Sequence, residues 1–245
     1  VSFLNKYNVV FLTIGLLPAV LLTDQRKLFI NKHFYFASFI GLIIISPNLI
    51  WQFKNNFPVV HHLHELANTQ LVNVNRIDFL KSQLFFFIGS LFVIFSALYA
   101  LIFYKPFQKY RTFFWVVIFT LLVFIYFKAK DYYAIGLYPI YISFGAVFLA
   151  DKVNQGWKKI LQPVFIAIPV LFFIPMYFVV FPNKSPAYII AHKQTYQKLG
   201  MLHWEDGKDH ELPQDFADML GWKELSVKVD SIYSKFPNKE KTLIL

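Results

Sequence analysis

Six long apolar runs limit the fold of this sequence more than any other feature. They cover residues 7–22, 34–51, 84–104, 113–127, 132–150 and 164–181. Each holds roughly 15–21 residues, close to the ~20 that an α-helix needs to cross a hydrocarbon layer of about 30 Å. The runs also lack the polar stripe that a surface helix of a soluble protein carries. The sequence therefore predicts an all-α polytopic membrane protein with about six transmembrane helices in residues 1–181.

Composition supports this fold class. Of the 245 residues 57% are hydrophobic and only 16% are charged, whereas soluble domains average about 25% charged residues. The formal net charge of +10 suits contact with anionic membrane lipids or an extracytoplasmic site for an anionic substrate. Nucleic acid is not an expected partner, because the basic residues are scattered over both predicted sides of the membrane.

The basic residues also predict an orientation. Alternate connections between the runs, at residues 23–33, 105–112 and 151–162, each carry three lysine or arginine residues. Because basic connections tend to stay in the cytoplasm, these three are predicted to be cytoplasmic. The intervening loops and everything after the sixth run are then predicted to be extracytoplasmic.

Residues 182–245 differ from the rest and read as a small water-facing domain. Residues 212–221 and 222–236 are predicted helices, the first with Pro213 near its start and Gly221 just past its end. The closing "TLIL", residues 242–245, is predicted to be a strand, so the domain reads as α/β and incomplete. Since both ends of the chain are apolar, we expect it to be a segment of a longer protein.

Three polar side chains between the second and third runs suggest a metal site. If residues 59–70 are helical, His61, His64 and Glu65 share one face and can ligate a divalent ion such as zinc, magnesium or manganese. The alternative is an interfacial helix whose histidines only contact water or headgroups. Spacing alone favours this alternative, because no further ligand is visible.

The stretch "KAKDYY" at the outer end of the fourth run is the second candidate site. Lys128 and Lys130 with Tyr132 and Tyr133 offer cations and hydroxyl donors to a phosphate or a sugar, and Asp131 can orient a lysine. Tyrosines and charges also anchor helices at membrane interfaces, so structure and function are equally good interpretations here.

Lys6 stands at the outer end of the first run. A lone lysine there commonly anchors its helix by extending the amine to the interface. It can also neutralise a lipid-borne phosphate, so both interpretations stay open.

Four stretches carry a family resemblance: "NKYNVVFL", "SPNLIWQFKNNFPVVHH", "KAKDYYAIGLYPIY" and "DFADMLGWKEL". In these the chain resembles bacterial members of glycosyltransferase family 39, relatives of the protein O-mannosyltransferases and of the transferases that add aminoarabinose to lipid A. The resemblance implies a GT-C fold in the plasma (inner) membrane of a bacterial cell envelope. It also implies transfer of a sugar, with inversion, from a polyprenyl-phosphate donor to an extracytoplasmic lipid, glycan or protein acceptor.

The resemblance also implies roles for particular residues. Lys6 matches a position that holds the lipid phosphate, and Lys130 and Tyr133 match positions that line the donor site. A histidine of the external loop takes part in a metal site in some relatives, which raises the metal interpretation of His61, His64 and Glu65 to equal standing. The catalytic aspartate of the family lies upstream of this sequence, so we expect the isolated segment to be inactive.

Two other function classes remain as alternatives. A secondary transporter usually places ionisable residues near the middle of the membrane, whereas the run interiors here hold only weakly polar residues such as Ser96, Thr120 and Ser143. A non-catalytic membrane scaffold that holds a partner through residues 182–245 is the other alternative. An acidic residue in an upstream external loop of the full gene would favour the enzyme.

Overall fold

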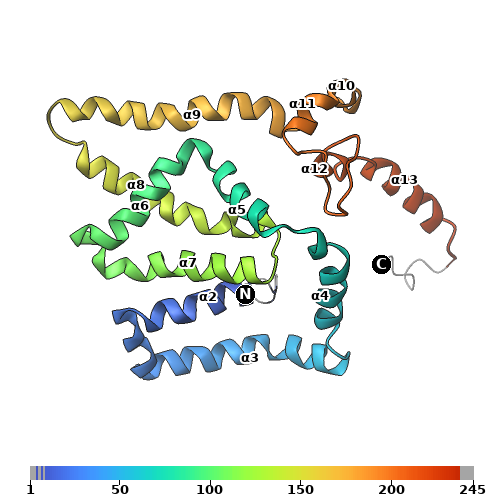
Figure 1. The fold of residues 1–245 in the computed structure, drawn as a ribbon. Helices are drawn as coiled ribbons and strands as arrows, with labels where there is room; N and C mark the ends of the chain where they lie inside the picture. The colour runs from blue at the N-terminus through green and yellow to red at the C-terminus, as the bar shows by residue number, and fades with distance from the viewer. Residues whose placement is uncertain (1–3, 5–6, 8, 238–245) are drawn as a thin grey trace. The chain divides into compact units, whose positions relative to one another are not determined.

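A computed structural model describes residues 4, 7 and 9–237 of the chain (Figure 1). The chain divides into two compact units, Val1–Tyr177 and Phe178–Leu245. The α-helices that begin in the first unit are α2 (Val9–Leu21), α3 (Lys32–Lys54), α4 (Pro58–Thr69), α5 (Arg76–Phe85), α6 (Leu91–Phe103), α7 (Arg111–Tyr126), α8 (Tyr138–Lys152) and α9 (Leu161–Val180). Short 3-10 helices connect them: η1 (Asp24–Ile30), η2 (Leu71–Asn73), η3 (Ile88–Ser90), η4 (Lys105–Tyr110), η5 (Asp131–Leu137) and η6 (Gly156–Ile160).

Each of the six predicted runs coincides with a helix, so the all-α polytopic class is confirmed. Four helical segments are long and apolar enough to cross a membrane: Lys32–Lys54, Lys105–Tyr126, Asp131–Lys152 and Gly156–Val180. The number rises to six if two bent pairs each count as one span, Val9–Leu21 with Asp24–Ile30 and Arg76–Phe85 with Ile88–Phe103. These pairs bend by 105° and 63°. The run at residues 84–104 is therefore not one straight helix, because α5 ends at Phe85 within it.

The core of the first unit lies among α5, α6, α7 and α8. Its buried side chains include Phe79, Leu101, Phe124 and Tyr141. Two helix pairs approach closely through glycine: α2 packs on α7 where Gly15 meets Thr120, and α6 packs on α8 where Gly145 meets the Val93 carbonyl. Small residues allow such close backbone contact between membrane helices.

The first unit has two distinct ends. In Figure 1 the turns that join α2 to α3, α6 to α7 and α8 to α9 lie together on the left. We call this the connector end. The opposite end, which we call the α4 end, holds α4, the start of α5 and the last turn of α7. This arrangement agrees with the predicted alternation of loops, while the side of the membrane that each end faces remains a prediction.

The second unit contains short helices around a small core. They are α10 (Pro186–Ala191), α11 (Lys193–Lys198), α12 (Gln214–Ala217) and α13 (Trp222–Tyr233). The core side chains are Ile189, Tyr196, Leu202 and Phe216. No strand occurs among the residues that the structure describes, apart from an isolated bridge between His203 and Asp209. The α/β prediction is therefore not shown, since the predicted strand at 242–245 lies outside the described residues.

Both predicted helices of the second unit are present, the first of them shortened. Helix α12 has only four residues, with Pro213 as its N-cap. Gly221 adopts a left-handed conformation with φ 82° and serves as the N-cap of α13. Glycine adopts this conformation without the steric cost of a Cβ, which is why the chain turns here between the two helices.

One acid-sensitive contact lies in the loop before α12. The backbone N–H of Lys208 donates to Asp206 at 3.0 Å, and His210 Nε2 lies 3.0 Å from the same carboxylate. These two contacts lower the pKa of Asp206 below its ordinary value. A carboxyl with a lowered pKa stabilises the fold above its unfolded-state pKa, and this stabilisation is lost as the pH falls through the folded-state value.

We therefore expect wild-type protein to lose a small amount of thermal stability as the pH is lowered from neutrality to below about 4. The Asp206→Asn variant should lose less over the same interval. Thermal unfolding of the purified chain at several pH values measures this. Asp215→Asn, at an exposed carboxylate of α12, is the matched control and should follow the wild-type curve. An Asp206→Asn curve that also follows wild type would contradict the prediction.

Candidate functional site

The turn after α7 is built on a strained residue. Helix α7 ends at Tyr126, and Lys128 follows in the left-handed region with φ 52°. This conformation lets the N–H of Lys128 donate to the Ile125 carbonyl and the N–H of Ala129 donate to the Phe124 carbonyl. Glycine or asparagine usually occupies such a position, because a Cβ in this region costs about 1–2 kcal/mol. Backbone strain of this kind clusters at ligand-binding sites, so the turn at Lys128 is a candidate for one.

Gln83 anchors the segment that follows Lys128. Its side chain lies in α5 and is only 5% exposed. The amide nitrogen donates to the Asp131 carbonyl at 3.0 Å, and the amide oxygen accepts from the Tyr138 hydroxyl at 3.2 Å. Asp131 begins η5, and Tyr138 follows its end. One buried amide thus holds both ends of the segment that carries the predicted donor-site residues.

Arg76 is the third residue, after Lys128 and Gln83, that shapes the α4 end. It is the first residue of α5, where the side chain of Asn75 caps the helix by accepting from the Ile77 N–H. Its Nε donates to the Ile125 carbonyl at 3.0 Å, so the guanidinium lies against the last turn of α7. Within residues 9–237 no acidic side chain pairs with it. The guanidinium therefore lies near the Lys128 turn, with no ion-pair partner among these residues.

An open apolar groove runs along α2 and α7 to Arg76. Its volume is about 650 Å³. It is lined by Ile14, Pro18, Phe119, Leu122, Val123, Ile125, Tyr126, Phe127 and Arg76. Among the described residues of this lining, Arg76 is the single charged one. Apolar side chains line most of this groove, and one cation lies in it. This arrangement suits an amphiphile with an anionic head group.

Side-chain hydrogen bonds tie the segment before α2 to α3 and α4. The hydroxyl of Tyr7 donates to Asn48 at 3.0 Å and accepts from the amide of Gln52 at 2.6 Å. Gln52 also accepts from the N–H of Val59, the second residue of α4. Asn56 and Phe57 between these helices both have positive φ. Lys6, the residue before Tyr7, lies outside the described residues, so its phosphate role stays a prediction.

The helix that carries the histidines is present, but a metal site is not assembled on it. His61, His64 and Glu65 lie on α4, and all three are exposed. His64 Nδ1 lies 3.1 Å from the side-chain nitrogen of Asn68. In the part of the chain that the structure describes, no group of three His, Cys, Asp or Glu side chains could hold a metal ion. The described residues thus assemble no ligand cluster around these histidines, and the metal site stays a prediction.

The predicted residues of "KAKDYY" all lie in one segment at the α4 end. Lys130 is the N-cap of η5, and Asp131, Tyr132 and Tyr133 form its first turn. The Asp131 carboxylate accepts from the Tyr132 N–H at 2.8 Å. It therefore orders the backbone of this turn.

Sequence reasoning missed Arg76 and Gln83. Both residues precede the apolar run at residues 84–104, but a charged or an amide side chain at such a position does not reveal which group it will hydrogen-bond. Their partners lie 49 and 48 residues further along the chain.

Comparison with known proteins supports the family resemblance. Residues 1–51, out of 245, match the family model described as dolichyl-phosphate-mannose-protein mannosyltransferase. Over these residues the chain is similar to membrane mannosyltransferases, in agreement with the resemblance to glycosyltransferase family 39. No curated protein and no solved structure matches the chain. The matched residues include Lys6 but not Arg76, Gln83 or Lys128.

Proposed function

We propose that this chain is the part of a glycosyltransferase that holds a polyprenyl-phosphate sugar donor, from which the sugar passes to an extracytoplasmic acceptor with inversion. The observation that carries the proposal is the apolar groove between α2 and α7 with Arg76 in its lining. The polyprenyl chain would lie in this groove. The phosphate would lie at the α4 end, close to Arg76 and to the turn that begins at Lys128.

Electrostatics explain how this end would assist the reaction. Negative charge grows on the phosphate oxygen as its bond to the anomeric carbon breaks. Cations placed beforehand around the leaving phosphate stabilise that charge more in a site shielded from water than in bulk solvent. Arg76 bonds a carbonyl only three residues before Lys128, so the guanidinium and this lysine belong to one local cluster. Lys130, at the start of η5, would add a third cation.

Inversion follows from a single displacement. The acceptor hydroxyl oxygen bonds to the anomeric carbon as the bond from that carbon to the phosphate oxygen breaks, and a base takes the hydroxyl proton. The resemblance assigns this base to an aspartate upstream of the present sequence. The chain described here would thus supply donor binding and stabilisation of the leaving group.

Orientation is part of the proposal. Residues 22–33, 104–112 and 151–161 at the connector end hold nine basic and two acidic residues. The described residues at and next to the α4 end include five basic ones, Lys54, Arg76, Lys81, Lys128 and Lys130, against Glu65, Asp78 and Asp131. Since an excess of basic residues marks the cytoplasmic side, the α4 end would face away from the cytoplasm. A polyprenyl-phosphate sugar presented at that surface would be in reach of extracytoplasmic acceptors.

The test is transfer of radiolabelled sugar from polyprenyl-phosphate donors by membranes that express the full-length gene. We expect Arg76→Gln to lower kcat/KM by about 10- to 100-fold, since a hydrogen bond to a charged group contributes about 1.5–3 kcal/mol. Lys128→Gly should also lower transfer, while the protein becomes more stable by up to about 1 kcal/mol because glycine relieves the left-handed backbone. A loss of activity with a gain of stability cannot be a folding defect.

Lys81→Gln is the matched control. Lys81 is an exposed cation near the same end, paired with Asp78 at 2.9 Å, and its replacement should leave transfer unchanged. Wild-type transfer in both the Arg76 and Lys128 variants would show that the donor binds elsewhere. No transfer from any donor by the wild-type protein would overturn the enzyme itself and favour a transporter or a scaffold.

A further inference from the structure

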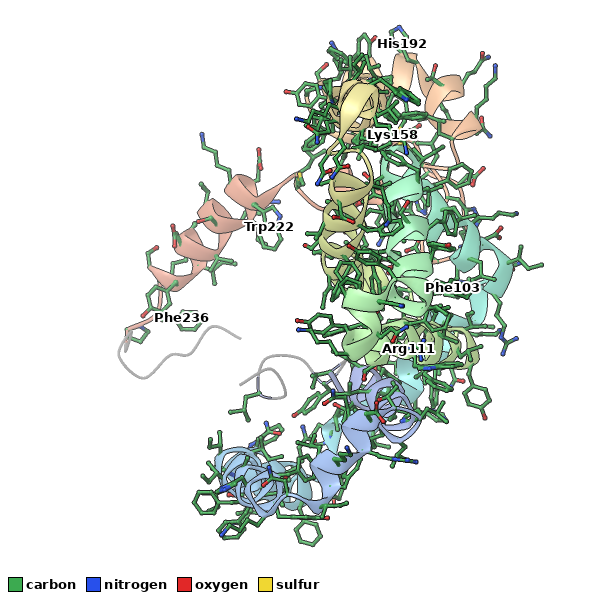
Figure 2. All side chains as sticks on the ribbon, turned by 90° about the vertical axis from the view of Figure 1, so that its left-hand side faces the viewer. Phe103, Arg111, Lys158, His192, Trp222 and Phe236 are labelled. Carbon is green, nitrogen blue, oxygen red and sulfur yellow. The ribbon has the colours of Figure 1, made fainter. Side chains whose placement is uncertain are left out.

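Side-chain hydrogen bonds join neighbouring elements at the connector end. The hydroxyls of Thr23 and Thr112 lie 2.9 Å apart and join the turn after α2 to the start of α7. The Tyr104 hydroxyl donates to the Asp151 carboxylate at 2.7 Å and joins the turn after α6 to the end of α8. Figure 2 looks onto this end, with Arg111 and Lys158 labelled. Basic residues of the three connections therefore lie at the same end of the first unit (Figure 1).

The positive charge of this surface is barely neutralised from within. Asp24 and Asp151 are its two acidic residues. Asp151 already accepts from Tyr104, and Lys152 lies 3.7 Å away with its amine over the Tyr104 ring. The other basic residues form no ion pair with any acidic side chain of residues 9–237. They are Arg26, Lys27, Lys32, Lys105, Lys109, Arg111, Lys158 and Lys159.

Large apolar side chains stand beside these cations and point away from the protein core. Ile30 in η1 is 85% exposed, and Trp157 and Ile160 in η6 are 73% and 70% exposed. Trp157 and Ile160 directly flank Lys158 and Lys159. Exposed apolar groups of this size are costly in water. At a membrane interface they insert among lipid chains, and tryptophan is enriched there.

We propose that the connector end binds anionic phospholipids of the leaflet it faces. Lysine and arginine side chains of η1, η4 and η6 contact the headgroup phosphates, and Ile30, Trp157 and Ile160 insert between the acyl chains. Ammonium and guanidinium groups form charge-assisted hydrogen bonds with phosphate oxygens. The neighbouring apolar side chains fit a lipid, because a free phosphate or a soluble acidic partner leaves them in water. This inference is independent of the donor site at the α4 end.

Brominated lipids test the proposal, because bromine quenches only tryptophans that it touches. The full chain is purified with Trp157 as its sole tryptophan, the other four being replaced by phenylalanine, and is reconstituted in phosphatidylcholine vesicles. Brominated phosphatidylglycerol and brominated phosphatidylcholine then compete for contact with Trp157. We expect phosphatidylglycerol to bind several-fold more strongly, since each basic residue near the surface contributes up to about fivefold.

The charge variants decide the outcome. In Lys158→Gln/Lys159→Gln the preference for phosphatidylglycerol should fall toward equality, whereas Lys54→Gln/Lys81→Gln at the α4 end should keep it. Equal binding of the two lipids in the parent protein, or a preference that survives Lys158→Gln/Lys159→Gln, overturns the proposal. So does loss of the preference on adding inorganic phosphate at constant ionic strength, since this would indicate a site for free anions.

Native mass spectrometry provides a second measurement if the single-tryptophan protein does not fold. The chain with all its tryptophans is released from mixed vesicles, and the retained lipids are weighed. We expect bound phosphatidylglycerol to exceed bound phosphatidylcholine, and Lys158→Gln/Lys159→Gln to remove this excess. Retention of both lipids in their vesicle proportions would refute the proposal.

Discussion

Replacing Gly145 with leucine is expected to disrupt the α6–α8 pair and to lower the free energy of unfolding by about 3 kcal/mol or more. A Cβ at Gly145 would overlap the Val93 carbonyl oxygen and its carbon. Backbone atoms cannot move aside as a flexible side chain can, so the two helices must separate. Their separation exposes the core around Ala97, Leu101 and Phe148, which α6 and α8 share.

Thermal or denaturant-induced unfolding of the purified protein in detergent measures this loss. Gly41→Leu is the matched control, because Gly41 lies inside α3 and a Cβ there meets nothing within 4 Å. Leucine favours a helix over glycine by up to about 1 kcal/mol, so the control should be as stable as wild type or slightly more so. Equal unfolding of Gly145→Leu and wild type would show that α6 and α8 do not pack as described.

Replacing Gln83 with leucine is the change with the next largest expected effect. Leucine leaves the Asp131 carbonyl and the Tyr138 hydroxyl without the hydrogen bonds that Gln83 makes. A polar group left unpaired in a buried position costs about 1–3 kcal/mol. We expect a loss of stability of about 2 kcal/mol and a decrease in sugar transfer larger than this loss explains, because residues 128–133 lose the anchor that orients them.

The orientation of that segment can be followed separately from stability. The chain contains no cysteine, so Ile135→Cys introduces a single thiol into η5. We expect this thiol to react faster with a soluble maleimide when Gln83 is leucine. Gln162→Leu, the same replacement at an exposed position of α9, should change neither labelling nor transfer. Unchanged labelling in Gln83→Leu would mean that η5 does not depend on this amide.

The positions of the membrane helices were predictable, because the free energy of inserting a helix into lipid depends on the residue types of one continuous stretch. The apolar runs coincide with α2, α3, α6, α7, α8 and α9, and the helix that the metal interpretation of His61, His64 and Glu65 assumed is present as α4. The bend between α5 and α6 was not predictable. Helix α5 ends at Phe85, inside the uniformly apolar run at residues 84–104, so hydropathy contains no signal for this break. The end of α2 at Leu21, in contrast, agrees with the predicted end of the first run at residue 22.

The candidate site divides in the same way. The sequence by itself determined the helical membrane class and the location of a polar turn at residues 128–133, since both follow from residue types in short stretches. The tertiary structure alone decided that Arg76 and Gln83 belong with this turn, that Lys128 has a left-handed backbone, and that α2 and α7 leave a groove between them. These features depend on contacts between residues almost 50 positions apart or on packing geometry, and a local sequence pattern encodes neither.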